Sequence, residues 1–363
     1  MNKFNRDIVN QTICIDGETY SKENINDLKS DDEALNSFYS SIKSFLNEWW
    51  KEDETILVHT SGSTGKPKSM FAEKTAMMTS AKNTLYFLNL HKGDTALLCM
   101  PMDYIAGKMM VVRALVGGLN LICRVPTGHP LKDLNEKVTF ASVIPLQIFN
   151  SLSNDSEKIK LMNIREVIVG GGAIDAKVEK ELCGMPNNIW STYGMTETLS
   201  HVAMRKLTGS NRSYWYRPLD GIKVSLTTES TLIIDAPEIC HNRLITNDIA
   251  EVNCLGEFKI IGRHDNIINS GGIKIQIEEV ENRLSDMLSF PFMITGKENE
   301  KFGSIIVLLA QCEEESRDEI EEICINVLPQ YWRPKEIIFI DKLPMTGSGK
   351  PDRAAAKCIA KKK

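Results

Sequence analysis

The stretch TALLCMPMDYIAGKMMVVRALVGGLNLICR, residues 95–124, decides the fold class. It begins and ends with short apolar runs, residues 95–100 and 119–124, and an apolar segment of helical length, residues 107–118, lies between them. Short apolar strands that are joined by a helix usually pair in parallel, and the connection crosses over with a right-handed sense. The stretch therefore predicts a strand–helix–strand unit of an α/β protein.

The same alternation continues on both sides of this unit. Short apolar runs predict further buried strands at residues 55–59, 139–144 and 166–172, and a helix is predicted at residues 73–90. Before them, the apolar residues of 37–50 recur at helical spacing. We expect a largely parallel sheet that is covered by helices on both faces.

The pattern changes after about residue 200. Residues 221–237 hold two β-rich runs around a polar turn, which predicts a small antiparallel or barrel-like section. Helices and strands then alternate in a unit long enough to fold around its own core, at residues 277–288, 303–310, 315–328 and 335–340. We predict a large N-terminal domain, 1–264, and a smaller α+β C-terminal domain, 265–363.

Composition and charge exclude several classes of function. The chain has 363 residues, 42% of them hydrophobic and 25% charged, and its net charge of −5 argues against binding to nucleic acid or to an anionic membrane. No apolar run approaches the roughly 20 residues of a spanning helix, and the N-terminus lacks the features of a secretory signal. The nine cysteines are scattered without a C-x-x-C pair, as in reduced cytoplasmic proteins. We expect a cytoplasmic protein without membrane insertion or nucleic-acid partners, and a homodimer stays open.

The loop HTSGSTGKPKSM, residues 59–70, has the composition of an anion-binding loop. It is not a Walker A loop, because its glycines are too close together and Pro67 follows Lys66, which removes a backbone donor. Backbone N–H groups, hydroxyls and an ammonium can still surround a polyphosphate, and a surface turn is the alternative. The residues that we predict to contact phosphate are Thr60, Ser61, Gly62, Ser63, Thr64, Gly65 and Lys68.

Further blocks follow this loop in a fixed order. They are GGGA at 170–173, STYGMTET at 191–198, TND at 246–248, GRHDNIINSGGIKIQIEEVE at 262–281 and LPMTGSGKPDR at 343–353. With the loop, they make residues 55–363 similar to the acyl-adenylate-forming superfamily, which includes acyl- and aryl-CoA synthetases. The resemblance implies the adenylate-forming enzyme fold and an ATP- and Mg²⁺-dependent activation of a carboxylic acid that is then transferred to CoA.

The resemblance also implies roles for the residues around the nucleotide. Tyr193 would offer an aromatic face to adenine, Thr196 a hydroxyl to the α-phosphate, and Glu197 an oxygen ligand to Mg²⁺. Asp248 would accept hydrogen bonds from the ribose hydroxyls, and Arg263 would strengthen that contact. Small residues would let the backbone approach the purine and the acyl group, namely Gly170, Gly171, Gly172, Ala173 and Gly194.

The C-terminal blocks carry the remaining implied machinery. Lys350 corresponds to the family's catalytic lysine, whose ammonium would stabilise the charge that develops during adenylation. Asp265 resembles the hinge about which the C-terminal domain swings between the two half-reactions. In the second orientation, Gly271 and Gly272 would leave room for the pantetheine arm of CoA.

The acyl substrate is suggested by the compact start of the chain. Fewer than sixty residues precede the phosphate loop, so we expect a reduced N-terminal subdomain. This build and the run YGMTETLSH are most similar to the o-succinylbenzoate:CoA ligases of menaquinone biosynthesis. The candidates for contact with that dicarboxylate are Tyr104, Lys108, Arg113, Gly170 and His201. The alternatives are solvated side chains for Lys108 and Arg113 and a structural role for His201.

Other functions stay open at this point. Another aryl or short acyl-CoA synthetase would carry the same blocks, and so would an adenylating enzyme that loads a carrier protein. A non-catalytic relative that only binds nucleotide is the alternative from a different class. It is disfavoured because both Glu197 and Lys350 are present.

Overall fold

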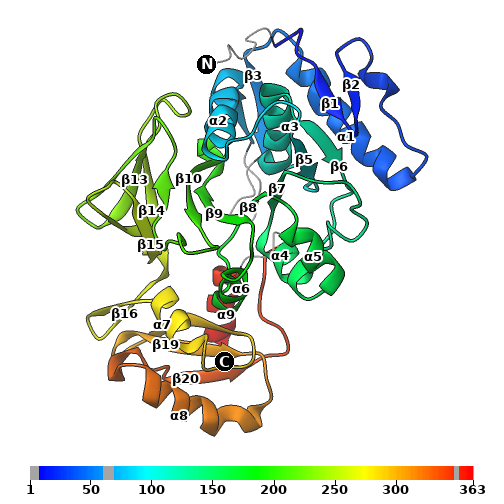
Figure 1. The fold of residues 1–363 in the computed structure, drawn as a ribbon. Helices are drawn as coiled ribbons and strands as arrows, with labels where there is room; N and C mark the ends of the chain where they lie inside the picture. The colour runs from blue at the N-terminus through cyan, green and yellow to red at the C-terminus, as the bar shows by residue number, and fades with distance from the viewer. Residues whose placement is uncertain (1–7, 60–68, 347–350, 363) are drawn as a thin grey trace. The chain divides into compact units, whose positions relative to one another are not determined.

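A nine-stranded sheet forms the frame of the first part of the chain (Figure 1). The computed structural model describes residues 8–59, 69–346 and 351–362. The strands follow the order β11-β10-β9-β8-β7-β5-β6-β1-β2, in which the edge strand β11 is Arg217–Pro218. The six strands from β9 to β1 pair in parallel, and the pairs β9–β10, β10–β11 and β1–β2 are antiparallel. The predicted α/β class with a largely parallel sheet is confirmed.

The strand–helix–strand unit predicted at residues 95–124 lies within this sheet. Strand β5 (Thr95–Leu98) pairs in parallel with β6 (Asn120–Cys123), and α3 (Ile105–Gly117) connects them. The helix ends at Gly118, which has a left-handed φ of 63° that favours glycine. The other predicted strands of the sheet are β7 (Phe140–Val143) and β8 (Glu166–Val169).

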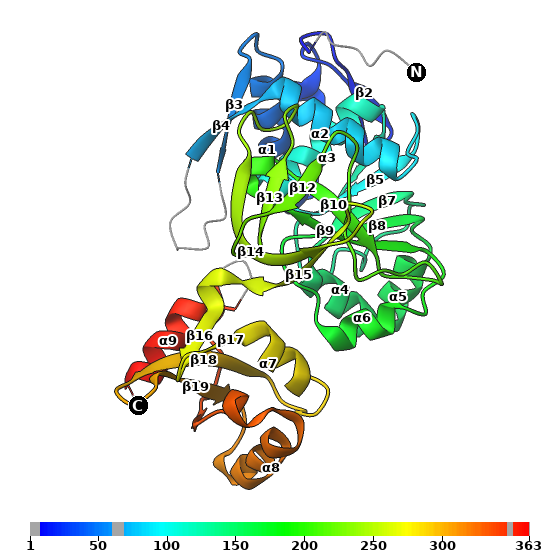
Figure 2. The same ribbon diagram turned by 90° about the vertical axis from the view of Figure 1, so that its left-hand side faces the viewer.

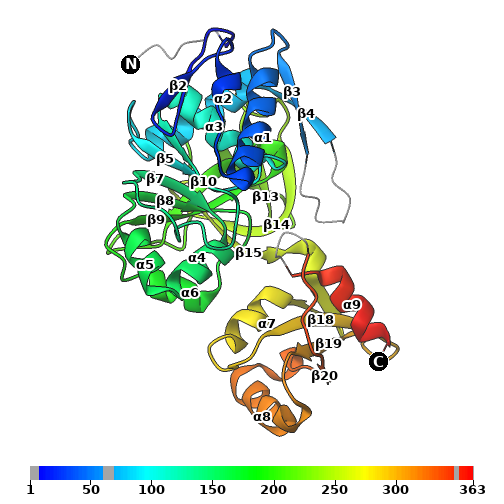
Figure 3. The same ribbon diagram turned by 90° about the vertical axis from the view of Figure 1, so that its right-hand side faces the viewer.

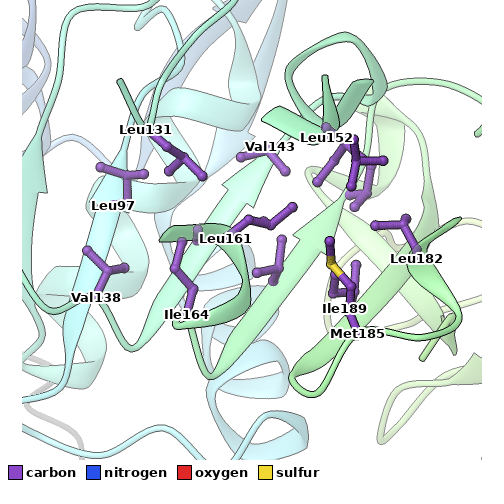
Figure 4. Close-up of a cluster of buried hydrophobic side chains, with 14 of the residues drawn as sticks. Leu97, Leu131, Val138, Val143, Leu152, Leu161, Ile164, Leu182, Met185 and Ile189 are labelled. Carbon is purple, nitrogen blue, oxygen red and sulfur yellow. The ribbon is translucent and has the colours of Figure 1, made fainter. Parts of the chain in front are cut away.

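Helices cover both faces of the sheet, as Figures 2 and 3 show. Helices α2 (Lys74–Phe87) and α3 lie on one face. Helices α4 (Pro145–Leu152), α5 (Asp155–Met162) and α6 (Ala176–Leu182) lie on the other. Alternate strand residues such as Leu97 and Val143 enter a buried cluster with Leu152, Leu161 and Leu182 of these three helices (Figure 4). Burial of this apolar surface holds the second layer to the sheet.

One predicted strand does not belong to the parallel sheet. Strand β3 (Thr55–His59) forms at the predicted position, but it pairs antiparallel with β4 (Ser69–Glu73) in a separate two-stranded sheet. Its side chains alternate, because Ile56 and Val58 are buried and Leu57 is 39% exposed. The expectation that β3 is a fully buried parallel strand was therefore wrong: only one face of the strand packs on the core.

The N-terminal region contributes a hairpin that the sequence reasoning did not predict. Strands β1 (Ile13–Ile15) and β2 (Glu18–Tyr20) are joined by Asp16 and Gly17, which both have positive φ. The Asp16 carboxylate accepts hydrogen bonds from the Tyr39 hydroxyl, 2.7 Å, and from the backbone N–H of Cys123, 3.1 Å. Tyr39 lies on α1 (Glu33–Trp49), so this one side chain ties the hairpin to a helix and to strand β6.

Two further sheets follow in the chain. The first has the order β12-β13-β14-β15, made of β12 (Lys223–Leu226), β13 (Thr231–Asp235), β14 (Leu244–Val252) and β15 (Phe258–Arg263). The second has the order β17-β16-β19-β18, with β20 (Glu336–Phe339) in parallel beside β19. Its other strands are β16 (Ile267–Ser270), β17 (Ile273–Gln276), β18 (Phe292–Asn299) and β19 (Gly303–Ala310).

The C-terminal sheet has its own hydrophobic core. Helices α7 (Ile277–Leu284) and α8 (Arg317–Val327) bury apolar residues against it, including Val280 and Ile320. Helix α9 (Arg353–Lys362) contributes Ala356 to a second cluster. Helices α7 and α8 and strands β19 and β20 are the elements predicted for the α+β unit, whereas β16, β17, β18 and α9 were not predicted.

The chain divides into two compact units. The first contains Met1–Val224 and Ile234–Leu244, and the second contains Ser225–Ile233 and Ile245–Lys363. The domain boundary at residue 265 stays a prediction. Within the described residues, no helix combines the length and the apolar character that a membrane crossing requires.

Candidate functional site

The predicted site residues that the structure describes fall into two groups, one in each unit. The first group lies on and before α3, after β8, and from the end of β9 to the first residue of β10, and the second lies on β14, β15 and the β16–β17 turn. Several predicted residues lie outside the described part of the chain: Thr60, Ser61, Gly62, Ser63, Thr64, Gly65, Lys68 and Lys350.

The turn that carries Thr196 and Glu197 is fixed by a buried hydroxyl. Strand β9 (Asn188–Gly194) leads into the short 3₁₀ helix η2 (Thr196–Thr198). The fully buried Thr198 hydroxyl accepts from the backbone N–H of Met195, 3.0 Å, and donates to the carbonyl of Ser200, 2.8 Å. Glu197 is exposed and Thr196 is half-buried. The turn therefore presents two oxygen-bearing side chains from a rigid base.

Two of the predicted glycines are required by the local backbone. Gly194 lies opposite His201 of β10 (His201–Lys206), and a Cβ atom on it would come within 2.3 Å of the Ser200 carbonyl oxygen. Gly171, after β8, has φ +85°. Close strand packing and a left-handed turn thus account for these two glycines without a ligand. Gly170 and Gly172 are half-buried beside it, and Ala173 is exposed.

Four polar residues form a buried chain of hydrogen bonds, called here the Arg113 cluster: Thr84, Arg113, Ser200 and His201. The Arg113 guanidinium donates to Ser200 Oγ, 2.6 Å, and Ser200 Oγ lies 3.4 Å from His201 Nδ1. His201 Nε2 lies 3.0 Å from Thr84 Oγ1, which donates to the Ser80 carbonyl, 3.1 Å. This direction of donation requires a proton on His201 Nε2.

The Arg113 cluster contains a cation without an acid. Arg113 is 2% exposed, no described carboxylate lies within ion-pair distance of it, and its Nε has no hydrogen-bond partner among the described residues. Burial lowers the pKa of Arg113 to about 9. Burial, together with the charge of Arg113, also holds the pKa of His201 well below its ordinary value. An unpaired buried guanidinium is costly, so an anion beside it would be strongly stabilised.

Two other predicted substrate residues, Tyr104 and Lys108, are not members of the Arg113 cluster. Tyr104 precedes α3 and is 45% exposed. The Lys108 ammonium donates to the Leu57 carbonyl of β3, 3.2 Å, and burial lowers its pKa. The structure thus gives Lys108 a backbone partner on strand β3, while Arg113 and His201 come together. Sequence spacing did not reveal Thr84 or Ser200, because they join the cluster through contacts far apart in the chain.

The second unit brings together the predicted ribose and hinge residues. Asp248 of β14 and Arg263 of β15 are register partners, and their side chains form an ion pair at 3.3 Å. Arg263 also contacts Asp265, 3.0 Å, which in turn accepts from the Asn247 amide, 3.1 Å. Arg263 and Asp265 are largely exposed to solvent. One guanidinium therefore bridges the two carboxylates that the resemblance assigns to the ribose and to the hinge.

The predicted CoA glycines form a hairpin turn. Gly271 and Gly272 join β16 to β17, and their φ values of 59° and 83° are those of a two-residue turn with left-handed central residues. Glycine is favoured at both positions for this reason alone. Their predicted role toward the pantetheine arm is compatible with this turn and stays a prediction.

The described residues fit a metal ion that is bound mainly by phosphate oxygens of ATP and by one protein carboxylate. They contain no group of three or more His, Cys, Asp or Glu side chains that could enclose a metal. Mg²⁺ in phosphate chemistry is commonly held by one or two carboxylates together with phosphate oxygens and water. A single exposed carboxylate on a fixed turn, such as Glu197, matches that mode.

Comparison with known proteins covers most of the chain. Residues 2–233 match the family model described as AMP-binding enzyme, and residues 293–350 match the AMP-binding enzyme C-terminal domain. A 2-succinylbenzoate--CoA ligase of Listeria monocytogenes is 26% identical over an alignment of 338 positions, which covers 85% of this chain and 71% of the relative.

Solved structures share the fold. An acyl-CoA synthetase (AMP-forming)/AMP-acid ligase II-like protein of Dyadobacter fermentans is 29% identical, with a TM-score of 0.64, and the match covers 93% of this chain and 97% of that one. The o-succinylbenzoate CoA synthetase MenE of Bacillus subtilis, solved with its acyl-adenylate intermediate OSB-AMP, is 22% identical with a TM-score of 0.70, over 83% and 68% of the two chains. The chain therefore belongs to the AMP-binding enzyme family.

Proposed function

We propose that the chain is an ATP-dependent acid:CoA ligase that converts 2-succinylbenzoate to its CoA thioester through an acyl-adenylate. The proposal is supported by the relatives that bear this name and by the adenylate-forming blocks of the sequence. Such a ligase would serve menaquinone biosynthesis. We propose that it acts in the cytoplasm, uses Mg²⁺ with ATP, and can form a homodimer.

The observation that carries the choice of substrate is the buried guanidinium of Arg113. It has hydrogen bonds to Ser200 Oγ and to the Met110 sulfur, 3.6 Å, but no described carboxylate beside it. 2-Succinylbenzoate has two carboxylates, of which only one reacts with ATP. The second can supply the missing anion, and a charge-assisted pair with arginine would fix the orientation of the acid.

His201 and Thr84 would orient this contact rather than make it. The neutral imidazole accepts from the Ser200 hydroxyl and donates to Thr84, so Ser200 is turned toward the Arg113 guanidinium. A neutral His201 also avoids a second positive charge next to Arg113. We propose that His201 sets the donor direction of the Arg113 cluster, and that Tyr104 and Gly170 lie nearer the reacting end of the acid.

The chemistry would use the residues of the η2 turn and the C-terminal lysine. Glu197 would hold Mg²⁺, which neutralises the phosphate charge when it is bound. Thr196 would hydrogen-bond the α-phosphate, and Tyr193 would face adenine. Lys350 would stabilise the charge on the phosphoryl oxygens while the acid attacks and pyrophosphate departs. Lys108 would steady strand β3, which leads into the phosphate loop.

Pyrophosphate release and thioester formation test the proposal separately. We expect pyrophosphate release from ATP and Mg²⁺ with 2-succinylbenzoate, and little with benzoate or fatty acids. Free CoA should then accept the acyl group. Activity with benzoate alone would indicate another aryl-CoA synthetase, and adenylation without transfer to CoA would indicate an enzyme that loads a carrier protein.

A further inference from the structure

A second aromatic ring lies beside Tyr193 within the first unit. The Tyr193 and Tyr216 ring centroids are 5.9 Å apart and the ring planes are tilted by 58°. The Tyr216 hydroxyl lies 2.8 Å from Ser191 Oγ. Ser191 and Tyr193 are two residues apart on β9 and so point to the same face of the sheet. Tyr216 thus contacts both the ring of Tyr193 and the strand that carries it.

The ring of Tyr216 is itself supported by an arginine. Arg205 lies on β10, directly opposite Ser191 in the antiparallel register, and its guanidinium is 5.5 Å from the Tyr216 ring centroid. Two hydrogen bonds, 2.7 and 2.6 Å, join that guanidinium to both oxygens of Glu179. A bidentate arginine–carboxylate pair has a fixed plane. The three side chains Glu179, Arg205 and Tyr216 are called here the Tyr216 bracket.

The helix that carries Glu179 follows the glycine run after β8 in the chain. Glu179 lies on α6, which begins after Asp175, two residues beyond Ala173. Figure 1 shows β8, β9 and β10 as neighbours in the sheet, with α6 beside them. The bracket therefore links Tyr193 to α6, the helix that begins shortly after residues 170–173, which are also predicted to face the purine.

We propose that Tyr216 is a positioning residue for the nucleotide, which fixes the plane of the Tyr193 ring before ATP binds. The inference rests on the proposed function, because it takes Tyr193 as the residue that stacks on adenine. A ring that is already ordered loses little rotamer freedom when the base arrives, and tilted aromatic pairs are favourable in themselves. Loss of Tyr216 should weaken ATP binding and leave the acid unaffected.

The test compares the apparent affinities for the two substrates in the full-length protein. Tyr216→Ala should raise KM for ATP by roughly three- to tenfold, the equivalent of one aromatic pair, with kcat and KM for 2-succinylbenzoate unchanged. Tyr216→Phe keeps the ring pair and loses only the bond to Ser191, so its KM for ATP should rise by less than about threefold. Tyr214→Ala is the matched control, because Tyr214 lies in the same segment and is 64% exposed.

Two results would overturn the proposal. One is an unchanged KM for ATP in folded Tyr216→Ala, and the other is an equal rise of KM for both substrates, which would indicate a general structural role. If Tyr216→Ala does not fold, Tyr216→Leu and Arg205→Met carry the same comparison. If the wild type releases no pyrophosphate with any acid, the proposed function fails, and calorimetric titration of wild type and variant with Mg-ATP still decides the role of Tyr216.

Discussion

The two groups of site residues differ in how firmly the protein holds them. In the first unit, the Arg113 cluster and the η2 turn are bonded through buried side chains such as Thr198 and His201. In the second unit, Asp248, Arg263 and Asp265 form ion pairs in which Arg263 and Asp265, the predicted hinge residue, face solvent. Buried polar networks are costly to break, whereas exposed ion pairs contribute about 0–1 kcal/mol and rearrange easily. The contrast suits a fixed substrate pocket and a group that rearranges during the cycle.

The largest expected effect tests whether the second unit has separate duties in the two half-reactions. Lys350→Ala should lower the rate of pyrophosphate release at least about a hundredfold, because a charge that stabilises the transition state is lost. Thioester formation from added acyl-adenylate and CoA should keep its rate. Lys342→Ala, at an exposed position of the same region, is the control. Equal loss of both half-reactions would contradict the idea of two orientations.

The next effect tests the Arg113 cluster, because one substitution should weaken substrate binding and at the same time stabilise the ligand-free protein. Arg113→Met should raise KM for 2-succinylbenzoate about a hundredfold, since a charge-assisted pair is lost, and should spare turnover of any monocarboxylate substrate. The same change should raise the free energy of unfolding of the ligand-free protein by about 1–3 kcal/mol, because a buried unpaired charge is replaced by an apolar side chain of similar length. Chemical denaturation measures this. A fall in the free energy of unfolding would mean that the Arg113 guanidinium already has a counter-charge in the ligand-free protein.

A smaller effect concerns pH. The folded-state pKa of His201 is depressed well below 6.5, so below about pH 6.5 the unfolded chain binds a proton that the folded protein does not bind. The stability contributed by neutral His201 is therefore complete above pH 6.5 and is lost as the pH falls. The wild type should lose stability more steeply than His201→Gln, by at most about 1.4 kcal/mol per pH unit. Parallel pH profiles from denaturation would show that His201 titrates normally.

The smallest effect tests the exposed group. Arg263→Ala should change the free energy of unfolding by less than about 1 kcal/mol, because the Arg263 guanidinium and its partner Asp265 are exposed to solvent. Its KM for ATP should rise several-fold if Arg263 supports the ribose. Arg243→Ala, which breaks the exposed pair with Asp235, should match its stability and leave KM unchanged. A large loss of stability in Arg263→Ala would place it with the fixed group instead.

The sequence predicted what depends on local pattern. The unit at residues 95–124 appeared as β5, α3 and β6 because burial on both faces leaves continuous apolar runs. Strand β3 was misplaced because a short half-buried strand looks the same in either kind of sheet. The β1–β2 hairpin did leave a signal, the Asp16–Gly17 dipeptide between two short β-forming runs, which is typical of a two-residue turn.

The partners within the site could not be predicted in this way. Arg113 meets Ser200 across 87 positions of the chain, and Thr84 meets His201 across 117. Tyr216 was not singled out, because its importance lies in the contact with Tyr193 and not in a motif. Blocks of sequence indicated which segments matter, but the bonds that fix them arise only from the packing of distant strands.

The pairing of β1 with β6 has a consequence for the order of folding. Cys14 is the register partner of Asn120, and the two are 106 residues apart. The N-terminal strand therefore emerges from the ribosome long before its neighbour exists, while β5 and β6 can pair as soon as α3 is made. Because closing long loops is slow, we expect β1 to dock late and its amide protons to gain protection after those of β5. An N-terminal fusion that slows the docking of β1 onto β6 should slow completion of the sheet without changing the free energy of unfolding of the finished protein.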